Sequence, residues 1–576
     1  MKTILRLLSP YKAKLILVAF IEAVGIVTAL LMPYVMSEIV EKGISASDMA
    51  RVWEYGIVML ILAGISVAGS LISVRITSRI SARYSRDLCQ ATFEKINSLS
   101  YSDYSKIGPS GLLTRATDDI FNIEEAVASL PYMLVSVPIM LVGSTVLSFM
   151  ADVTLSLIFM VSIPAVLIIV YFLMRPLGDM WDISDKYIDI QNKIVRERLS
   201  CLRVVRAFNS EHREHARAKH ATEEMSKYMI RANTRGGFVE PLVMLLLNIA
   251  TVAVVFFGGI RAEGGSGLVA GDIIAVLQYI AMLSNALISV SWTLSWLPRL
   301  KVSVKRINEV HSLPSEDEDI SDKTESGFGI KMKNVSFTYP DSSESVLKNI
   351  SLSINEGERV AFIGGTGSGK TSLVRILSGL FDITDGEICI GETSYSELSK
   401  REIRRHFSVA LQKAAIFEGT IRENIKMGKP DATDEEISEV LRLSRIDDYV
   451  HSHDEGLDYI LVGMGRNASG GQKQRLSMAR TVIKDADIYI FDDSFSALDF
   501  LTESEIRKNY LERLSGKTQI YVTQRVGTAM NAERIYVMSD GVIVAEGNHE
   551  KLLAECEIYR EIALSQLGKG AIGGAV

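Results

Sequence analysis

The sequence predicts two parts, an α-helical membrane domain followed by a soluble α/β domain. The chain has 576 residues, more than one hydrophobic core usually holds. Its mean hydropathy is positive, +0.19, although 23% of its residues are charged, so part of the chain is expected to face lipid. Long apolar segments occupy the first half, whereas strand-like patterns and glycine-rich turns begin near residue 328.

Six segments are long and apolar enough to be membrane spans, which need about 20 residues each. They cover roughly 15–36, 56–74, 129–150, 153–174, 242–260 and 272–294. The sixth is the most polar, with Gln278, Ser284 and Asn285, and also fits a buried helix of a soluble protein. Its position after the fifth segment favours a span.

Loop charge predicts the orientation in the membrane. Two long connections, after the second and fourth spans, are rich in basic residues: Arg75, Arg79, Arg83, Arg86, Lys95, Arg115, Lys193, Arg196, Arg198, Arg203, Arg206 and Arg213. Basic loops stay in the cytoplasm. We therefore expect a multi-pass protein of the cell membrane with both termini and the C-terminal domain in the cytoplasm.

Both connections have helical periodicity and few helix breakers, and they are too long for simple loops. We expect each to be a helix pair that extends the spans into the cytoplasm, with turns near 100–111 and 202–214. Separate small domains are the alternative, but neither segment has enough apolar residues for its own core.

The N-terminal segment has charges between apolar residues and no cleavage site, which predicts a short elbow helix on the membrane surface. Glu22 lies inside the first span, where a carboxylate is costly. It either lines a substrate cavity or is protonated or paired with another helix.

The net charge of −7 argues against a nucleic-acid partner. The four cysteines are widely spaced and fit free thiols.

Composition places the domain boundaries. Residues 1–306 form the predicted membrane domain, and an acidic, polar linker occupies 307–327. The α/β domain covers 328–567, and 568–576 is a tail.

Near the start of the α/β domain, an apolar strand runs into a complete P-loop pattern and then an amphipathic helix. The glycines let backbone N–H groups surround phosphate oxygens, and the helix N-terminus favours their negative charge. The predicted phosphate-binding residues are Gly364, Gly365, Thr366, Gly367, Ser368, Gly369, Lys370, Thr371 and Ser372. Thr371 would also bind Mg²⁺, as would Asp492, which ends the apolar run 488–491.

The segment Ala468-Ser469-Gly470-Gly471-Gln472 resembles the signature motif of ATP-binding cassettes, and the order of the other motifs resembles this family along nearly the whole chain. Tyr339 resembles the aromatic residue that stacks on adenine. Gln412 resembles the Q-loop glutamine that reaches the metal, and 496–499 resembles the D-loop. The six spans and the sequence RVVRAF resemble the exporters of this family.

The resemblance implies a half-transporter. Two such chains associate, and their cassettes hold two Mg²⁺-bound ATP molecules, each between one P-loop and the other chain's signature, here Ser469–Gln472. Closure of the cassettes then turns the membrane halves outward.

Three positions depart from the family pattern. The catalytic glutamate is replaced by Asp493, which is one methylene shorter and holds its carboxylate about 1 Å further from the attacking water. The switch histidine is replaced by Gln524, which cannot carry a positive charge. Before the signature, Met464 stands where glutamate is usual. The pattern resembles the degenerate subunit of bacterial heterodimeric multidrug exporters.

We therefore expect an ATP site that binds well and hydrolyses slowly, paired with a half-transporter that has an intact glutamate and histidine. A slow homodimer that uses Asp493 as its base is the alternative. The expected substrates are amphipathic drugs, lipids or peptides, because most chains of this architecture are exporters. Import of a metal chelate and an ATP-gated channel or sensor remain alternatives.

Overall fold

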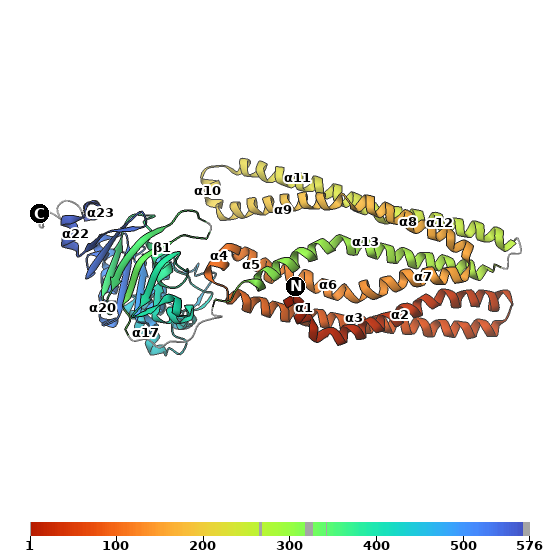
Figure 1. The fold of residues 1–576 in the computed structure, drawn as a ribbon, viewed down its shortest axis with the longest axis horizontal. Coiled ribbons are helices and arrows are strands. Elements are labelled where there is room, and N and C mark those ends of the chain that lie inside the picture. The colour runs from red at the N-terminus through yellow and green to blue at the C-terminus, as the bar shows by residue number, and fades with distance from the viewer. Residues whose placement is uncertain (1, 264–267, 317–326, 341, 568–576) are drawn as a thin grey trace. The chain divides into compact units, whose positions relative to one another are not determined.

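The computed structural model describes residues 2–263, 268–316, 327–340 and 342–567 (Figure 1). The chain divides into two compact units. The first contains the chain up to Glu94 together with Leu113–Ser312, and the second contains Lys95–Leu112 together with the chain from Leu313. The tip of the first long connection therefore groups with the C-terminal domain.

The first unit is helical throughout. Its elements, some of which end in the second unit, are α1 (Lys2–Leu8), η1 (Ser9–Tyr11), α2 (Lys12–Glu38), η2 (Ile39–Ser45), α3 (Met49–Asn97), α5 (Pro109–Ala116), α6 (Asp118–Pro131), η3 (Tyr132–Ser136), α7 (Val137–Ala151), α8 (Val153–Met174), α9 (Leu177–Ser200), α10 (Leu202–Ala207), α11 (Glu211–Gly237), α12 (Val239–Glu263) and α13 (Ala270–Ser312).

The predicted helical membrane domain is confirmed. Five described helical stretches are long and apolar enough to cross a membrane: Arg6–Ser45, Met49–Asn97, Pro109–Ala151, Glu211–Glu263 and Ala270–Val290. They match the first, second, third, fifth and sixth predicted spans. The fourth predicted span coincides with α8, one continuous helix of 22 residues.

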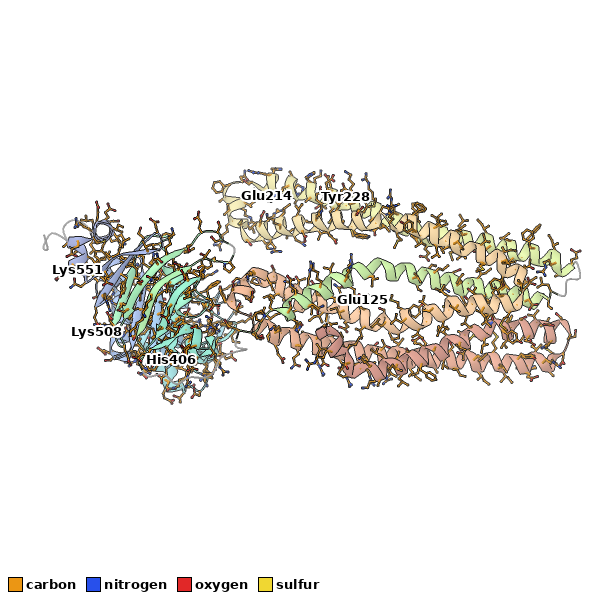
Figure 2. All side chains as sticks on the ribbon, viewed as in Figure 1. Glu125, Glu214, Tyr228, His406, Lys508 and Lys551 are labelled. Carbon is orange, nitrogen blue, oxygen red and sulfur yellow. The ribbon has the colours of Figure 1, made fainter. Side chains whose placement is uncertain are left out.

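The long connections are helical extensions, as expected. The single helix α3 has 49 residues and carries both the second span and the start of the first connection. In the second connection, α9 and α11 run side by side and are joined by α10 (Figure 1). Tyr187 of α9 stacks on Tyr228 of α11 with ring centroids 6.2 Å apart, and Tyr228 is labelled in Figure 2. The two predicted turns contain short helices, α4 (Tyr101–Ile107) and α10.

The predicted domain boundary at residue 306 is too early. The helix α13 continues to Ser312 because Ile307 and Val310 are fully buried, with Ile307 in a cluster that includes Ile4, Ile80 and Tyr84. Residues 317–326 of the predicted linker and the predicted tail, 568–576, lie outside the described residues.

The second unit is an α/β domain, which confirms the predicted class. Its strands are β1 (Ile330–Phe337), β2 (Leu347–Ile354), β3 (Arg359–Ile363), β4 (Asp385–Ile390), β5 (Thr393–Ser394), β6 (Phe407–Ala410), β7 (Gly419–Thr420), β8 (Ile460–Leu461), β9 (Ile488–Asp492), β10 (Thr518–Thr523), β11 (Arg534–Ser539) and β12 (Val542–Gly547).

Helices of this unit surround the strands. They are α4, already given, and α14 (Lys370–Leu377), η4 (Tyr395–Glu397), α15 (Lys400–His406), α16 (Ile421–Lys426), α17 (Asp434–Leu443), α18 (Asp447–His451), η5 (Gly456–Asp458), α19 (Gly470–Ile483), α20 (Phe500–Arg513), α21 (Val526–Ala529), α22 (His549–Glu555) and α23 (Glu557–Leu567).

The main sheet has six strands in the order β12-β11-β3-β10-β9-β6, and all pairs except β12 with β11 are parallel. Its central strands are buried on both faces. Residues of β3 alternate between two core clusters, with Val360 and Phe362 in one and Ala361 and Ile363 in the other. Such double burial is typical of parallel sheets. A second sheet has the order β2-β1-β4-β5.

The helix α4 packs on the α/β domain within the second unit. The ring of Tyr101 meets the ring of Phe381 edge-on at 5.2 Å, and the backbone N–H of Glu316 donates to the Ser98 carbonyl at 2.8 Å. An aromatic contact and a backbone hydrogen bond thus hold the tip of the first connection against this domain.

Candidate nucleotide-binding site

Four neighbouring parallel strands end at one edge of the main sheet. In their register, Ile363 of β3 lies opposite Thr523 of β10, Val522 lies opposite Asp492 of β9, and Phe491 lies opposite Ala410 of β6. The segments that follow these ends surround a cavity of about 210 Å³ lined by Val346, Thr366–Ser372, Gln412, Asp492, Asp493, Val522 and Gln524. Ligands of open α/β sheets bind at such an edge.

The P-loop needs glycine at several positions. Gly367 and Gly369 have φ angles of 85° and 97°, in the left-handed region that favours glycine. At Gly364, a Cβ atom would lie 2.2 Å from the carbonyl oxygen of Met538. The loop then leads into α14, whose N-terminus lies at the cavity, so its free N–H groups are available to phosphate oxygens.

Lys370 is buried at the base of this loop. Its ammonium donates to the carbonyls of Gly364 at 2.9 Å and Gly365 at 2.7 Å, and to Ser368 Oγ at 3.1 Å. Burial lowers its pKa, and the nearby carboxylates of Asp492 and Asp493 oppose that shift. A buried cation held by neutral carbonyls is well placed to receive an anion.

Asp492 is 2% exposed at the end of β9. Burial raises its pKa to about 6, against the effect of the hydrogen bond from Thr371. Bound Mg²⁺ would reverse this shift, and a carboxylate, a hydroxyl and the amide oxygen of Gln412 suit that metal. Within the described parts of the chain no three His, Cys, Asp or Glu residues are grouped for a metal.

Asp493 is half-buried and has a φ angle of 47°, a conformation that is uncommon for a residue other than glycine. Its backbone N–H donates to the Val522 carbonyl at 2.7 Å, which ties it to β10. Burial raises the pKa of its carboxyl, and a hydrogen bond with Gln412 lowers it. The structure therefore brings the two predicted catalytic residues Asp493 and Gln412 together.

The switch position, Gln524, follows β10 and is braced by the C-terminal helix α23. The side chain of Gln566 donates to the Gln524 carbonyl at 2.7 Å and accepts from the Val526 N–H at 2.8 Å. Gln566 could not be predicted from the sequence, because no local motif marks a residue that is 42 positions away from Gln524 along the chain.

Tyr339 does not line the cavity but contacts its rim. Its hydroxyl hydrogen-bonds with Ser372 Oγ at 2.9 Å and accepts from Arg375 at 2.9 Å. Its ring meets Phe381 edge-on at 5.3 Å. Stacking of Tyr339 on adenine stays a prediction.

The four signature residues do not line the cavity of their own chain. Ser469 caps α19, where it forms a reciprocal capping box with Gln472. A Cβ atom at Gly470 would meet nothing within 4 Å, so the backbone there is open to an incoming ligand. The single chain therefore presents two separate elements, the P-loop cavity and an exposed helix N-terminus.

Comparisons with known proteins agree with this arrangement. Residues 15–287 match the model of the ABC transporter transmembrane region, and residues 347–496 match that of the ABC transporter family. An ABC transporter ATP-binding protein of Mycobacterium tuberculosis (strain H37Rv), Rv1273c, is 33% identical over 572 residues, 98% of each chain. Its counterpart YfiB of Bacillus subtilis (strain 168) is 31% identical over 575 residues, 99% of each.

The chain belongs to the ABC transporter family. Among solved structures, a bacterial Atm1-family ABC exporter with ATP bound has the same fold, with a TM-score of 0.83 over 97% of this chain and 98% of that one at 20% identity. The α/β domain of this transporter is thus its ATP-binding cassette, an ATPase coupled to transport, and the α-helical domain spans the membrane.

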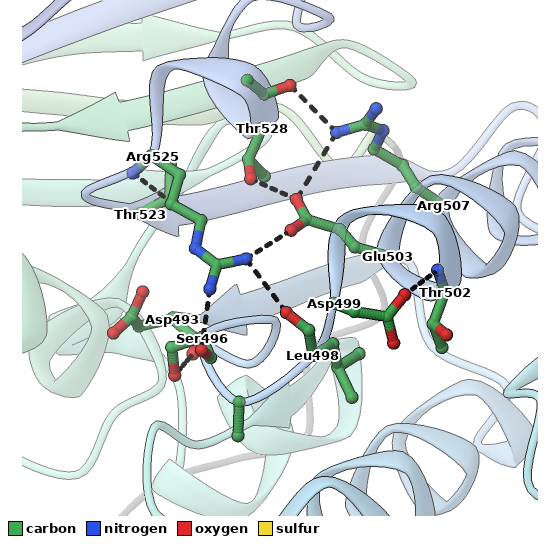
Figure 3. A network of polar contacts seen from close by, with 12 residues as sticks. Asp493, Ser496, Leu498, Asp499, Thr502, Glu503, Arg507, Thr523, Arg525 and Thr528 are labelled. Atoms are coloured by element: carbon green, nitrogen blue, oxygen red, sulfur yellow. Dashed lines mark hydrogen bonds and ion pairs between the residues drawn. The ribbon is translucent and has the colours of Figure 1, made fainter. Parts of the chain in front are cut away.

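A buried carboxylate links the D-loop of the transporter to the switch position (Figure 3). Glu503 of α20 is 3% exposed and pairs with Arg525 at 2.8 Å, with Arg507 at 3.6 Å and with the Thr528 hydroxyl. Arg525, the residue after Gln524, also donates to the carbonyls of Ser496 at 2.8 Å and Leu498 at 3.3 Å. This network could not be predicted from the sequence, because its members come from three separate segments.

Replacing Glu503 with glutamine should destabilise the cassette, because Arg525 and Arg507 then lose their buried partner. The loss of about 3 kcal/mol expected for a broken buried pair lowers the melting temperature by roughly 5–10 °C. The control Glu505→Gln breaks the exposed pair with Arg445, which contributes little. Differential scanning calorimetry of the full chain measures both, and equal melting temperatures would contradict the role of the network.

Replacing Lys370 with alanine should weaken ATP binding to this chain by about tenfold or more, because the phosphates lose their charge-assisted hydrogen bonds. Crosslinking of a photoreactive ATP analogue to the full chain measures occupancy. The control Lys508→Ala removes an exposed lysine on α20, labelled in Figure 2, and should leave occupancy unchanged. Equal labelling of both variants would refute the P-loop assignment.

Proposed function

We propose that this chain is one half of a heterodimeric exporter and that its own ATP site binds ATP but hydrolyses it slowly. The observation that carries the proposal is the cavity itself. Its lining combines the P-loop residues Thr366–Ser372, which include Lys370, and Asp492 with Asp493 and Gln524 at the two positions that would act on the γ-phosphate. The binding groups are present, and only the groups that activate water and stabilise the transition state are altered.

The partner would supply what this chain lacks. The signature residues Ser469–Gln472 lie away from their own cavity, at an open helix N-terminus that suits a phosphate from another chain. A half-transporter with an intact glutamate and histidine would then form one fully active site with this signature. Each site would hold ATP with Mg²⁺, which Thr371, Asp492 and Gln412 would bind.

The proposed direction is export of amphipathic drugs, lipids or peptides from the cytoplasm, with both termini on the cytoplasmic side. The exporter fold supports this direction. A relative named ATP-dependent lipid A-core flippase, of Syntrophus aciditrophicus (strain SB), is 28% identical over 526 residues, 90% of this chain and 86% of its own length. The name of this relative supports an amphipathic substrate for this chain.

The proposal predicts that, of two changes that remove or add a carboxylate, one has a small and the other a large effect on the ATPase turnover of the assembled transporter. Asp493→Asn should reduce turnover less than twofold, because this site contributes little hydrolysis. Ser469→Asp should reduce it by about a hundredfold, because the new carboxylate still caps α19 but repels the partner's γ-phosphate.

The matched control for Ser469→Asp is Thr433→Asp, which places aspartate at the cap of α17, another helix with a capping box. It should retain wild-type turnover. Collapse of activity in Asp493→Asn would identify Asp493 as the working base and favour the homodimer. Full activity in Ser469→Asp would exclude a role of the signature in a partner's site.

Restoring the family pattern with Asp493→Glu and Gln524→His together should shorten the lifetime of ATP on this chain and raise total ATPase activity. In the wild type, ATP here should outlast several turnovers at the partner's site and keep the cassettes in contact. Trapping a photoreactive ATP analogue during turnover measures its lifetime on each chain. Equal lifetimes in the wild type, or ADP that accumulates first on this chain, would contradict the proposal.

A further inference from the structure

The membrane domain contains a cavity of about 410 Å³ between α2, α3, α6 and η3. Its lining includes Glu22, Gly25 and Ile26 of α2, a row of hydroxyl residues of α3, and Tyr132 of η3. Among the described residues that line it, Glu22 is the only acidic one, and none is Lys, Arg or His. The cavity therefore has one acidic group and no basic side chain to neutralise it.

Two buried hydroxyl groups hold the Glu22 carboxylate. Ser73 Oγ, 1% exposed, donates to Oε1, and Ser136 Oγ, fully buried, donates to Oε2 at 2.9 Å. A carboxylate accepts about four hydrogen bonds, so these two orient it and leave acceptor sites free. Hydroxyl donors fix its position but do not cancel a negative charge.

The cavity also contains an unused polar atom. Ser66, Ser70, Ser73 and Thr77 follow one another at helical spacing on one face of α3, and all four line the cavity. Thr77 is 7% exposed, and its hydroxyl oxygen has no hydrogen-bond partner among the described residues. Unpaired buried hydroxyls are unfavourable in an apolar environment, so this atom is available to a polar group that enters the cavity.

Close helix packing fixes the cavity. A Cβ atom at Gly69 of α3 would lie 3.6 Å from the Ile21 carbonyl oxygen and 3.8 Å from the Cα of Gly25, so α2 and α3 approach backbone to backbone beside Glu22. On another wall is the ring of Tyr132, held through its hydroxyl at 3.1 Å from Ser289 of α13. An aromatic ring and a carboxylate that line the same cavity suit a cation.

We propose that this cavity is a binding site for amphipathic organic cations, with Glu22 as the group that recognises the positive charge. An isolated carboxylate within a membrane span is costly, and a bound cation would offset that cost. The apolar part of such a molecule would contact Ile26, Val74 and Tyr132, and a polar substituent would reach Thr77. This inference rests on the proposed transport function and assigns a substrate class to it.

The test uses two probes of matched shape and opposite charge, tetraphenylphosphonium and tetraphenylborate. Their binding is measured by equilibrium dialysis against the full chain in lipid nanodiscs, with any half-transporter that copurifies. Glu22→Gln should weaken tetraphenylphosphonium binding by about tenfold or more and leave tetraphenylborate binding equal or stronger, because a full charge attracts a cation more than an amide dipole does. Glu54→Gln, which removes an exposed carboxylate of α3 outside the cavity, should change neither.

Each outcome decides the proposal. Equal tetraphenylphosphonium affinity in the wild type and Glu22→Gln would overturn it, and so would equal loss of both probes, which would reveal a merely structural role for Glu22. Thr77→Val offers a second, milder variant that should weaken binding of cations with a hydroxyl substituent and not of tetraphenylphosphonium. Failure of the transport function would instead appear in the wild type, as probe binding without ATP-dependent accumulation in vesicles.

Discussion

The parallel register of β3, β10, β9 and β6 is the constraint on which the cassette depends. Each strand is followed by a segment with different chemistry, and adjacent parallel strands must end at the same edge of the sheet. Burial of the central strands on both faces makes this register hard to shift, because a one-residue slip would exchange side chains between the two core clusters and disrupt their packing. The cavity is thus held by the core and not by its own loops.

Burial also sets the electrostatics of that cavity. Lys370 and Asp492 lie in a poorly solvated region, where burial lowers the pKa of the first and raises that of the second. Both pKa shifts disfavour the charged forms of these residues. A bound nucleotide phosphate would stabilise the charged Lys370, and its cation would stabilise the charged Asp492. The fold therefore keeps Lys370 and Asp492 in a state that a bound ligand would stabilise.

Each domain contains a carboxylate whose position is fixed by polar partners, and the two differ in whether those partners also compensate its charge. In the cassette, buried Glu503 has a guanidinium partner at 2.8 Å, so its charge is compensated and the cluster ties the D-loop to the switch position. In the membrane domain, Glu22 has only hydroxyl donors, so its position is fixed but its charge is not compensated. The first cluster is complete within the chain, and the second is open to a ligand.

Local patterns were enough to predict the class of both domains, the helical membrane segments, the P-loop strand and helix, and the strand that ends in Asp492. Hydrophobic periodicity and glycine spacing are encoded in consecutive residues, so sequence alone determined them. Composition did not place the end of α13 correctly, because the acidic residues beyond 312 suggested a linker that begins at 307. Burial extended the helix instead: Ile307 and Val310 are fully buried, and Ile307 packs in a cluster with residues of distant helices.

Only the tertiary structure decided which distant residues meet. Gln566 bridges the loop after β10, Glu503 pairs with Arg525, and Ser73 and Ser136 converge on Glu22. These partners are separated by between 22 and 114 positions along the chain, so no local pattern pairs them. Their meeting depends on how helices and strands pack, since a side chain's partner across an interface is set by the relative position of two elements and not by the sequence of either.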